Sequence, residues 1–319
     1  MRSGPGREKL KSERASRRRS GRCAHLLLNA FVVCFVQFYM HCEQPVAVSD
    51  LDTFLDSPQI AAEVYFPRQV RNAPPPGATD YNIPINDQVS LGARWYLGDP
   101  NRPTVLIFHG NGETVPDYNF VARGFLELAK LNVFVVDYRG YGWSTGRPTL
   151  RSLLEDARPV VRFFLRTLEE HNAATGARPP RPILYGRSLG SAPACEIAVS
   201  ELAGNFSALV LDSAFSEIRL LLKLFRIDPA AAGAFEEPVA EMFSNATKLK
   251  RTALPVMIIH GEKDHLIPPE HAWQNHNSMA EDHPHRLLLM PDAGHNDLML
   301  RADLYFGGLE RFVREHVTN

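Results

Sequence analysis

The stretch that decides the fold is Ile183-Leu184-Tyr185-Gly186-Arg187-Ser188-Leu189-Gly190. Its three apolar residues end directly before a Gly-x-Ser-x-Gly motif. The residues that follow, 191–198, have the composition of a helix, and the proline among them stands in the first turn, where proline is tolerated. A strand, a sharp turn at a serine and a helix in immediate succession form a nucleophile elbow, which strains the serine backbone and needs glycine on both sides. The segment therefore predicts Ser188 as a nucleophile.

A second Gly-x-Ser-x-Gly motif, Gly142-Trp143-Ser144-Thr145-Gly146, lacks this context. The strand before it is expected to end near Asp137, so a loop rich in tyrosine and glycine separates strand and motif. Arg147-Pro148 follows where an elbow needs a helix. We interpret Ser144 as a loop serine.

On both sides of the elbow, short apolar runs alternate with helical stretches. The runs are Thr104–Phe108, Val133–Val136, Ile183–Tyr185, Ala208–Leu211, Pro255–Ile259 and Arg286–Met290, and Ser152 with Glu155 forms a potential capping box for a helix that ends near Glu170. Continuous apolar runs indicate strands buried on both faces. The alternation predicts an α/β fold with an open, mostly parallel sheet flanked by helices, whose ligand lies at the carboxyl ends of the strands. Two earlier stretches, Glu63–Phe66 and Val89–Leu97, also have strand character.

A serine, an aspartate and a histidine follow three of these runs in chain order: Ser188, then Asp264 in His260-Gly261-Glu262-Lys263-Asp264, then His295 in Gly294-His295-Asn296-Asp297. A serine hydroxyl is a weak nucleophile near neutral pH and needs a base within hydrogen-bond reach. In this hypothesis His295 takes the Ser188 proton and returns it to the leaving group. Asp264 fixes the imidazole tautomer and stabilises its charged form.

The oxyanion of a tetrahedral intermediate needs hydrogen-bond donors. We expect them to be the backbone N–H groups of Leu189 and of Asn111, in the loop His109-Gly110-Asn111-Gly112-Glu113. Asp212 also follows a strand and is the alternative acid. We expect Asp137 to be a structural carboxylate, and His109 and His260 to hydrogen-bond their loops.

No cofactor is predicted. The histidines between His271 and His285 lack metal-ligand spacing, and no glycine-rich nucleotide motif opens a helix after a strand. Three of the four cysteines, Cys23, Cys34 and Cys42, lie in or beside one apolar segment. That leaves only Cys195 in the body, so neither a disulfide framework nor a zinc cluster is expected.

The insertion after Asp212, residues 213–253, is expected to form a small lid. Residues 218–227 carry a broad apolar face and an opposite stripe of Arg219, Lys223 and Arg226 at helical spacing. One interpretation is a lid helix packed on the domain. The other is a lid shaped for an acyl chain near a membrane.

Together these motifs, with Asp137-Tyr138-Arg139-Gly140-Tyr141-Gly142, resemble the α/β-hydrolase superfamily, and within it the serine-aminopeptidase-like and membrane-associated α/β-hydrolase-domain branch. The resemblance covers roughly residues 60–319, and we place the hydrolase domain at 58–319. It implies a serine hydrolase without cofactors that acts on esters, thioesters or lipids, with Ser188, Asp264 and His295 in the catalytic roles and Asn111 and Leu189 as oxyanion donors. The alternatives are a peptidase of the same fold and a catalytically idle, membrane-anchored binding protein. An epoxide-type hydrolase would need an aspartate where Ser188 stands.

The formal net charge of −1 combines a basic tail of +7 at residues 1–22 with a body of −8. An apolar segment at 23–42 joins them and is expected to act as an uncleaved signal anchor, with a cleaved signal peptide or a surface-bound targeting segment as alternatives. Positive flanks stay cytoplasmic, so the first two options place the body in the lumen or outside the cell. The sequons at Asn205 and Asn245 fit that location. The expected partners are a small-molecule or lipid acyl substrate and a membrane, and no nucleic acid.

Overall fold

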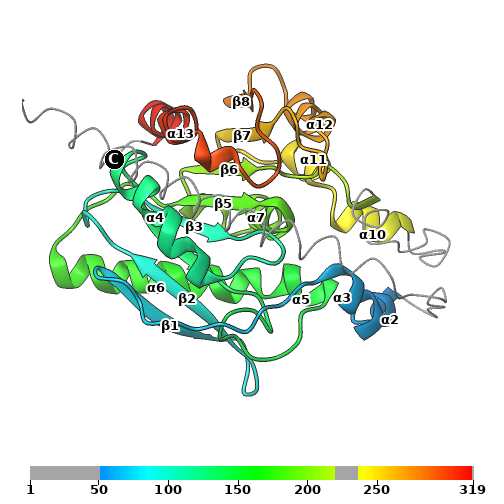
Figure 1. Ribbon diagram of the computed structural model, residues 1–319, viewed down its shortest axis with the longest axis horizontal. Coiled ribbons are helices and arrows are strands. Elements are labelled where there is room, and N and C mark those ends of the chain that lie inside the picture. Colours follow the sequence, from blue (N-terminus) through cyan, green and yellow to red (C-terminus); the bar gives the residue numbers. More distant parts are fainter. Residues whose placement is uncertain (1–50, 220–235, 318–319) are drawn as a thin grey trace, which may run out of the picture. The chain divides into compact units, whose positions relative to one another are not determined.

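A computed structural model describes residues 51–219 and 236–317 of the chain. The basic tail at 1–22, the apolar segment at 23–42 and residues 220–227 of the predicted lid helix lie outside the described residues. Within the described part, the strands form a single sheet that helices cover on both faces (Figure 1). No helix of residues 51–219 and 236–317 is both long enough and apolar enough to cross a bilayer.

The sheet runs in the order β1-β2-β4-β3-β5-β6-β7-β8. Its strands are β1 (Ala78–Pro84), β2 (Ser90–Tyr96), β3 (Thr104–Phe108), β4 (Asn132–Val136), β5 (Ile183–Arg187), β6 (Ala208–Asp212), β7 (Val256–Gly261) and β8 (His285–Met290). The pairs β1–β2 and β2–β4 are antiparallel, and all other neighbours are parallel. The predicted open, mostly parallel sheet is confirmed, and its central strands β3 to β7 are completely buried.

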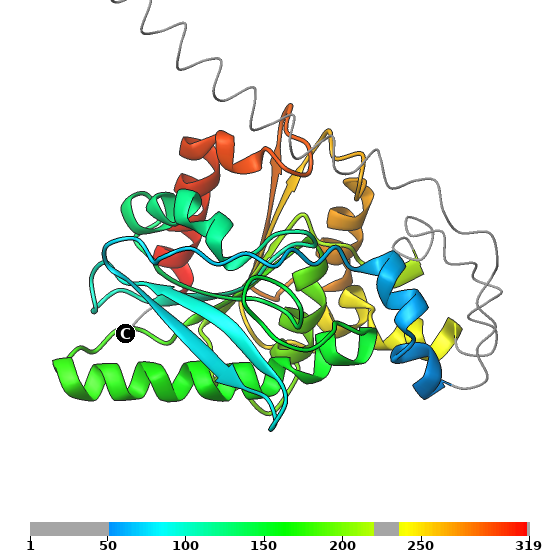
Figure 2. The same cartoon turned by 60° about the horizontal axis from the view of Figure 1, so that its bottom comes forward.

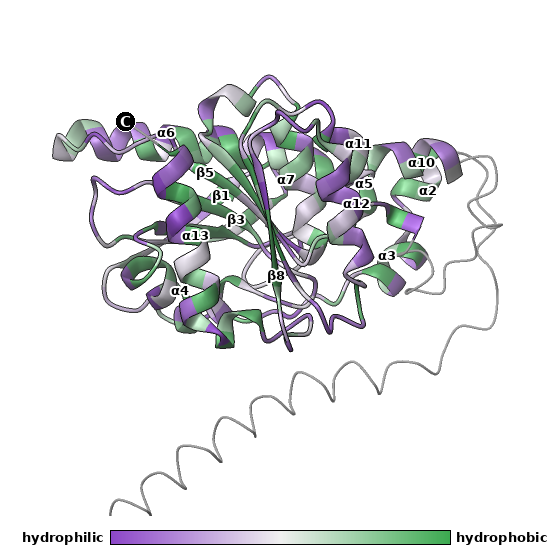
Figure 3. Ribbon diagram, turned by 90° about the horizontal axis from the view of Figure 1, so that it is seen from above, coloured by the Kyte–Doolittle hydropathy of each residue, from purple (hydrophilic) through white to green (hydrophobic). Residues whose placement is uncertain are grey.

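Two layers of helices enclose this sheet. On one face lie α4 (Tyr118–Glu127) and α13 (Ala302–His316), and on the other lie α5 (Leu150–Glu155), α6 (Ala157–Thr175), α7 (Ser191–Ala198), α11 (Asn245–Leu249) and α12 (Glu270–Ser278). Figure 2 shows α4 and α13 on the opposite side of the strands from α6. The central strands are largely hydrophobic in Figure 3, and each face packs its own buried apolar cluster.

Short helices accompany the sheet at two other places. Before β1 the chain forms α2 (Leu51–Leu55) and α3 (Pro58–Val64), which add Phe54 and Ile60 to the buried cluster on the α6 face. Within the insertion between β6 and β7, α10 (Glu236–Met242) precedes α11.

The structure corrects the prediction for the segment before β2. Glu63 and Val64 end helix α3 instead of starting a strand, because Ser57 caps that helix through a bond from the Ile60 N–H to Ser57 Oγ, and Pro58 suits its first turn. Strand β1 was not predicted, since its half-exposed edge position leaves it without a continuous apolar run. The helix predicted from Ser152 to Glu170 is two helices, α5 and α6.

The cap of α5 also differs from the prediction. Thr149 is the N-cap residue: its hydroxyl accepts a bond from the Ser152 N–H at 3.0 Å, and Ser152 Oγ accepts one from the Thr149 N–H at 2.8 Å. The reciprocal bonding predicted between Ser152 and Glu155 is therefore made one turn earlier, by Thr149 and Ser152.

Candidate active site

Ser188 lies at a sharp turn between β5 and α7. It is 7 % exposed and has a positive φ of 51°, which is uncommon for a residue with a side chain. The two glycines of the motif are required by close packing. A Cβ on Gly190 would lie 2.0 Å from the carbonyl oxygen of Phe108, and a Cβ on Gly186 would lie 2.5 Å from the carbonyl oxygen of Gly190. The backbone is thus a strained elbow, as the sequence predicts.

The structure brings His295 and Asp264 to this serine. Nε2 of His295 lies 3.0 Å from Ser188 Oγ, and Nδ1 of the same ring lies 2.7 Å from Asp264 Oδ2. An ionised carboxylate can only accept hydrogen bonds, so Nδ1 carries the proton and Nε2 presents its lone pair to the hydroxyl. The three side chains come from the loops after β5, β7 and β8, and all are at least nine-tenths buried.

Asp264 is held on both carboxylate oxygens. Oδ1 accepts the backbone N–H groups of Leu266 and Ile267 at 2.9 and 2.8 Å, and Oδ2 faces His295. Burial alone would raise the pKa of Asp264, but hydrogen bonds from His260 and His295 keep that pKa below its ordinary value. The carboxylate therefore stays ionised beside the imidazole.

Asn111 lies in the loop after β3, and its side chain is tied to the segment that follows α3. Its Oδ1 accepts bonds from the Tyr141 hydroxyl at 2.6 Å and from the Phe66 N–H at 3.1 Å, and its Nδ2 donates to the Val64 carbonyl at 2.6 Å. The backbone N–H of Asn111 has no hydrogen-bond partner within residues 51–219 and 236–317. Leu189 is the second residue of the short helical turn Ser188–Gly190, and backbone N–H groups in the first turn of a helix lack partners inside the helix.

The rival residues are engaged elsewhere. Asp212 Oδ2 accepts bonds from the hydroxyls of Tyr185 and Tyr305 at 2.6 and 2.7 Å, and its Oδ1 accepts one from Ser213. Ser144 is 2 % exposed and accepts the N–H of Gly92, so it is a loop serine as expected.

The two strand-end histidines contact carbonyl groups of their own loops, as expected, and Asp137 bonds to the segment after β3. His109 Nδ1 lies 2.8 Å from the carbonyl oxygen of Gly110, and His260 Nε2 lies 2.8 Å from that of Ile267. Asp137 is buried and accepts the N–H of Val115.

Sequence reasoning assigned no role to Tyr141 or Arg187, although both stand inside quoted motifs. Arg187 precedes the nucleophile, is 8 % exposed, and donates to the His295 carbonyl at 3.0 Å. A signal existed: an arginine that ends an otherwise apolar buried strand needs a buried partner. For Tyr141 the sequence offers no comparable signal.

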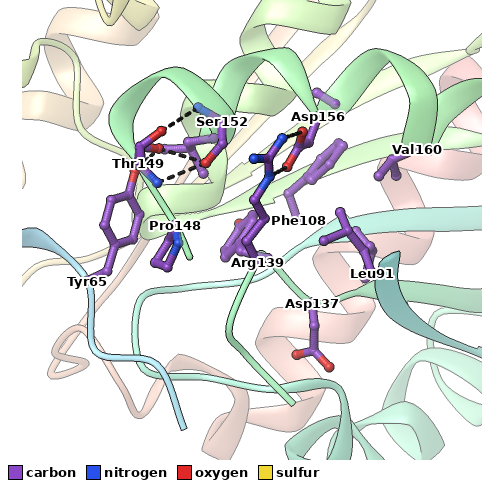
Figure 4. A pocket seen from close by; sticks show the side chains of 14 residues that line it. Tyr65, Leu91, Phe108, Asp137, Arg139, Pro148, Thr149, Ser152, Asp156 and Val160 are labelled. Carbon is purple, nitrogen blue, oxygen red and sulfur yellow. Dashed lines mark hydrogen bonds and ion pairs between the residues drawn. The ribbon is translucent and has the colours of Figure 1, made fainter. Parts of the chain in front are cut away.

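Figure 4 shows a small cavity between β3 and helices α5 and α6, lined by Tyr65, Phe108, Tyr138, Thr149 and Leu153 among others. Arg139 and Asp156 also line this cavity, and Arg139 donates to both carboxylate oxygens of Asp156 at 2.7 Å. None of Ser188, Asp264 and His295 lines this cavity. It is therefore separate from the candidate active site.

Within the part of the chain that the structure describes, no group of three or more His, Cys, Asp or Glu residues is arranged to hold a metal ion. In the stretch from His271 to His285, His271, His283 and His285 lie within hydrogen-bond distance of protein atoms. For example, His271 Nδ1 lies 2.7 Å from Ser216 Oγ, and His283 Nε2 lies 3.1 Å from the Thr252 carbonyl.

The chain is similar in sequence to known proteins. Residues 99–246 match the family described as serine aminopeptidase, S33. Protein bem46 of Schizosaccharomyces pombe is 28% identical over 237 residues, which cover 73% of this chain and 75% of that protein. The human α/β hydrolase domain-containing protein 17B is 30% identical over 222 residues, which cover 69% of each chain.

Solved structures share the fold. The Pyrococcus furiosus esterase Pf2001 aligns with a TM-score of 0.58 at 20% identity, over 79% of this chain and 97% of the esterase. Est1E of Butyrivibrio proteoclasticus, solved with ferulic acid bound, aligns with a TM-score of 0.55 at 17% identity, over 74% and 98% of the two chains. The chain therefore belongs to the α/β-hydrolase superfamily, in its serine-aminopeptidase-like, α/β-hydrolase-domain branch.

Proposed function

We propose that the protein hydrolyses carboxylic esters or thioesters through an acyl-enzyme intermediate on Ser188. One observation carries the proposal: Ser188 Oγ, the His295 ring and Asp264 Oδ2 form a continuous hydrogen-bonded chain with links of 3.0 and 2.7 Å. A nucleophile, a base and a carboxylate that orients the base are the parts that acyl transfer to water requires.

In the proposed reaction Ser188 Oγ attacks the carbonyl carbon of the substrate while His295 Nε2 accepts the hydroxyl proton. The N–H groups of Leu189 and Asn111 donate to the oxyanion of the tetrahedral intermediate. When the intermediate collapses, the bond to the leaving alkoxide or thiolate breaks, and His295 returns the proton to that group. Water then attacks the acyl-enzyme while His295 Nε2 accepts its proton, and the bond between the acyl carbon and Ser188 Oγ breaks. His295 returns the proton to Ser188 Oγ, which releases the carboxylic acid and restores the free serine.

An apolar acyl group is the substrate that we propose for this site. Phe120 on α4 and Leu300 before α13 are 86% and 64% exposed, although large apolar side chains tend to be buried. Phe120 follows the loop after β3 that holds Asn111, which we call the oxyanion loop. Leu300 follows the loop after β8 that holds His295, which we call the base loop. Both residues therefore belong to segments that start at the carboxyl ends of the parallel strands, where the ligand of such a sheet lies. Exposed apolar side chains on these segments support an acyl chain or a lipid surface as the ligand.

Labelling with a fluorophosphonate probe tests the proposal, because the probe reacts only with an activated serine. We expect the wild-type chain to be labelled, and the Ser188→Ala variant, which lacks the nucleophile, to remain unlabelled at the same concentration. Equal labelling of both chains, or of neither, would reject the hydrolase mechanism, and no labelling at all would favour the idle binding protein.

p-Nitrophenyl esters of increasing chain length then test the acyl preference. We expect kcat/KM to rise from acetate to octanoate. Equal values for short and long chains would reject an acyl-binding role for the exposed apolar residues, and cleavage of peptide p-nitroanilides in preference to esters would favour the peptidase alternative.

A further inference from the structure

Arg187 spans the space between the oxyanion loop and the base loop. Its Nη1 lies 3.1 Å from Glu113 Oε1 in the loop after β3. Its Nη2 donates to the carbonyl oxygen of His295 at 3.0 Å and to Asn296 Oδ1 at 3.2 Å. The planar guanidinium group therefore fixes two loops at once, from a residue directly beside the nucleophile.

Glu113 closes the oxyanion loop on itself. Its Oε2 accepts the Gly110 N–H at 2.9 Å and the Tyr118 hydroxyl at 3.0 Å, while Oε1 faces Arg187. The Gly110–Glu113 turn is closed a second time by a bond from the Glu113 N–H to the Gly110 carbonyl. Asn111 stands inside this turn, so its N–H can move only if the turn moves.

The loop packs directly on the ion pair. A Cβ on Gly110 would lie 3.0 Å from Arg187 Nη1 and 3.1 Å from the Glu113 carboxyl group, so a side chain there would push the two partners of the ion pair aside. Both side chains are largely buried, with 9% of Arg187 and 15% of Glu113 exposed. Burial alone would raise the pKa of Glu113, but Arg187 holds that pKa below its ordinary value.

We propose that Glu113 and Arg187 act as a positioning pair, which sets the distance between the oxyanion donor of Asn111 and the base His295. The inference rests on the proposed ester or thioester hydrolysis and assigns to the pair a role in kcat. Neither residue touches the reacting atoms. They act through the Gly110–Glu113 turn and through the His295 backbone.

Stability alone does not account for the pair. Replacing a buried ion pair by apolar residues of similar volume is often neutral or stabilising, because two charges must lose their water. Apolar side chains of the same volume could not fix the orientation of the two loops. The guanidinium group of Arg187 fixes the geometry of its acceptors, and one of these acceptors is the backbone carbonyl of His295. A small displacement of either loop would lengthen the contacts that form in the transition state.

The test measures kcat and KM on p-nitrophenyl acetate for Glu113→Gln, Arg187→Met and the double variant. Arg139→Met is the matched control, because it breaks another largely buried arginine–carboxylate pair, Arg139–Asp156, whose residues line the separate cavity. Thermal unfolding shows that each variant is folded at the assay temperature. Ser188→Ala sets the background rate.

Each single variant is expected to lower kcat by about 10- to 100-fold and to change KM by less than about threefold. The double variant should be no slower than the slower single, since the two residues act as one unit. The control should lose thermal stability and keep its kcat within about twofold. If Arg187→Met does not fold, Glu113→Gln, which keeps an oxygen acceptor, carries the test.

Three results would overturn the inference. The first is an active wild type whose Glu113→Gln and Arg187→Met variants match Arg139→Met in kcat. The second is a double variant whose loss of kcat is the product of the two single losses. The third is a wild type without Ser188-dependent hydrolysis, which would remove the proposed function and the pair's role together. In the first two cases the proposed function survives.

Discussion

Nε2 of His260 lies 3.3 Å from Oδ2 of Asp264, the same oxygen that faces His295. His260 is fully buried on β7 and also contacts the Ile267 carbonyl at 2.8 Å, so it joins the strand to the turn that carries the carboxylate. The Asp264 carboxylate is thus oriented by a contact from strand β7 as well as by the hydrogen bonds within its own loop.

Asp264→Asn tests the role of this carboxylate. The amide keeps an oxygen for the N–H groups of Leu266 and Ile267, but its NH₂ group would face His295 and favour the wrong imidazole tautomer. We expect kcat on p-nitrophenyl acetate to fall by about 10⁴-fold, as in other serine triads. Asp303→Asn, at an exposed aspartate in the first turn of α13, should leave kcat unchanged. A loss smaller than tenfold in Asp264→Asn would point to a different acid, such as Asp212.

Tyr141→Phe tests whether the Asn111 side chain holds the oxyanion loop. The change removes the hydroxyl that donates to Asn111 Oδ1 at 2.6 Å and leaves the ring in place. We expect kcat to fall by about three- to tenfold with little change in KM, since the loss concerns the placement of a transition-state donor. An unchanged kcat in steady-state assays would show that Phe66 and Val64 suffice to hold Asn111.

Ser144→Ala separates the two Gly-x-Ser-x-Gly motifs by experiment. The Ser144 hydroxyl accepts the buried Gly92 N–H at 2.8 Å, so the alanine variant leaves this donor unpaired. We expect the free energy of unfolding to fall by about 1–3 kcal/mol, while fluorophosphonate labelling of Ser188 persists. Loss of labelling in a folded Ser144→Ala protein would contradict the assignment of Ser144 to a structural loop.

Glu196→Gln tests a pH dependence of stability away from the active site. Burial alone would raise the pKa of Glu196, but Lys248 at 3.1 Å and Arg158 at 3.1 Å keep that pKa below its ordinary value. A lowered folded pKa means that the glutamate stabilises the protein above the unfolded pKa of about 4.3, and that this contribution is lost as pH falls through the folded value.

We therefore expect wild type to exceed Glu196→Gln by roughly 1 kcal/mol in free energy of unfolding near pH 7. The difference should shrink below about pH 4.3. Urea denaturation across this range provides the measurement. A difference that grows toward acid pH would reject the assignment.

The parallel strands and the meeting of Ser188, Asp264 and His295 could be predicted from the sequence because each depends on local signals. The catalytic roles of the three residues stay a proposal. Buried parallel strands are continuous apolar runs. A residue that directly follows such a run lies at the carboxyl end of its strand, where the ligand of such a sheet lies, and this placement does not depend on the connecting segments. Strand β1 gave no such signal, since it is an edge strand that gains its stability from pairing with β2. The residues Glu63 to Phe66 favour a strand by composition, but Ser57 and Pro58 start a helix that includes Glu63 and Val64 and ends there.

The contacts that hold the loops of the candidate active site in place could not be predicted, because they join segments that are distant in the sequence. Asn111 is bonded to Phe66 and Tyr141, and Arg187 to Glu113 and His295, across separations of 30 to more than 100 residues. Only the folded sheet brings these partners together. A motif shows that a polar residue is present, but the partner that holds it depends on tertiary packing.

Asn245 is the asparagine of one of the two sequons. In a compartment that contains the glycosylation machinery, attachment of a glycan to Asn245 would compete with folding. The residue is completely buried, and its Nδ2 donates to Ser191 Oγ and to the Phe215 carbonyl at 2.8 Å, at the start of helix α7, which follows Ser188. A sugar could be attached there only before α11 packs, and it would then keep α11 from packing. A glycan on exposed Asn205 would not disturb the packing. A glycan on buried Asn245 would identify a molecule that was modified before it folded.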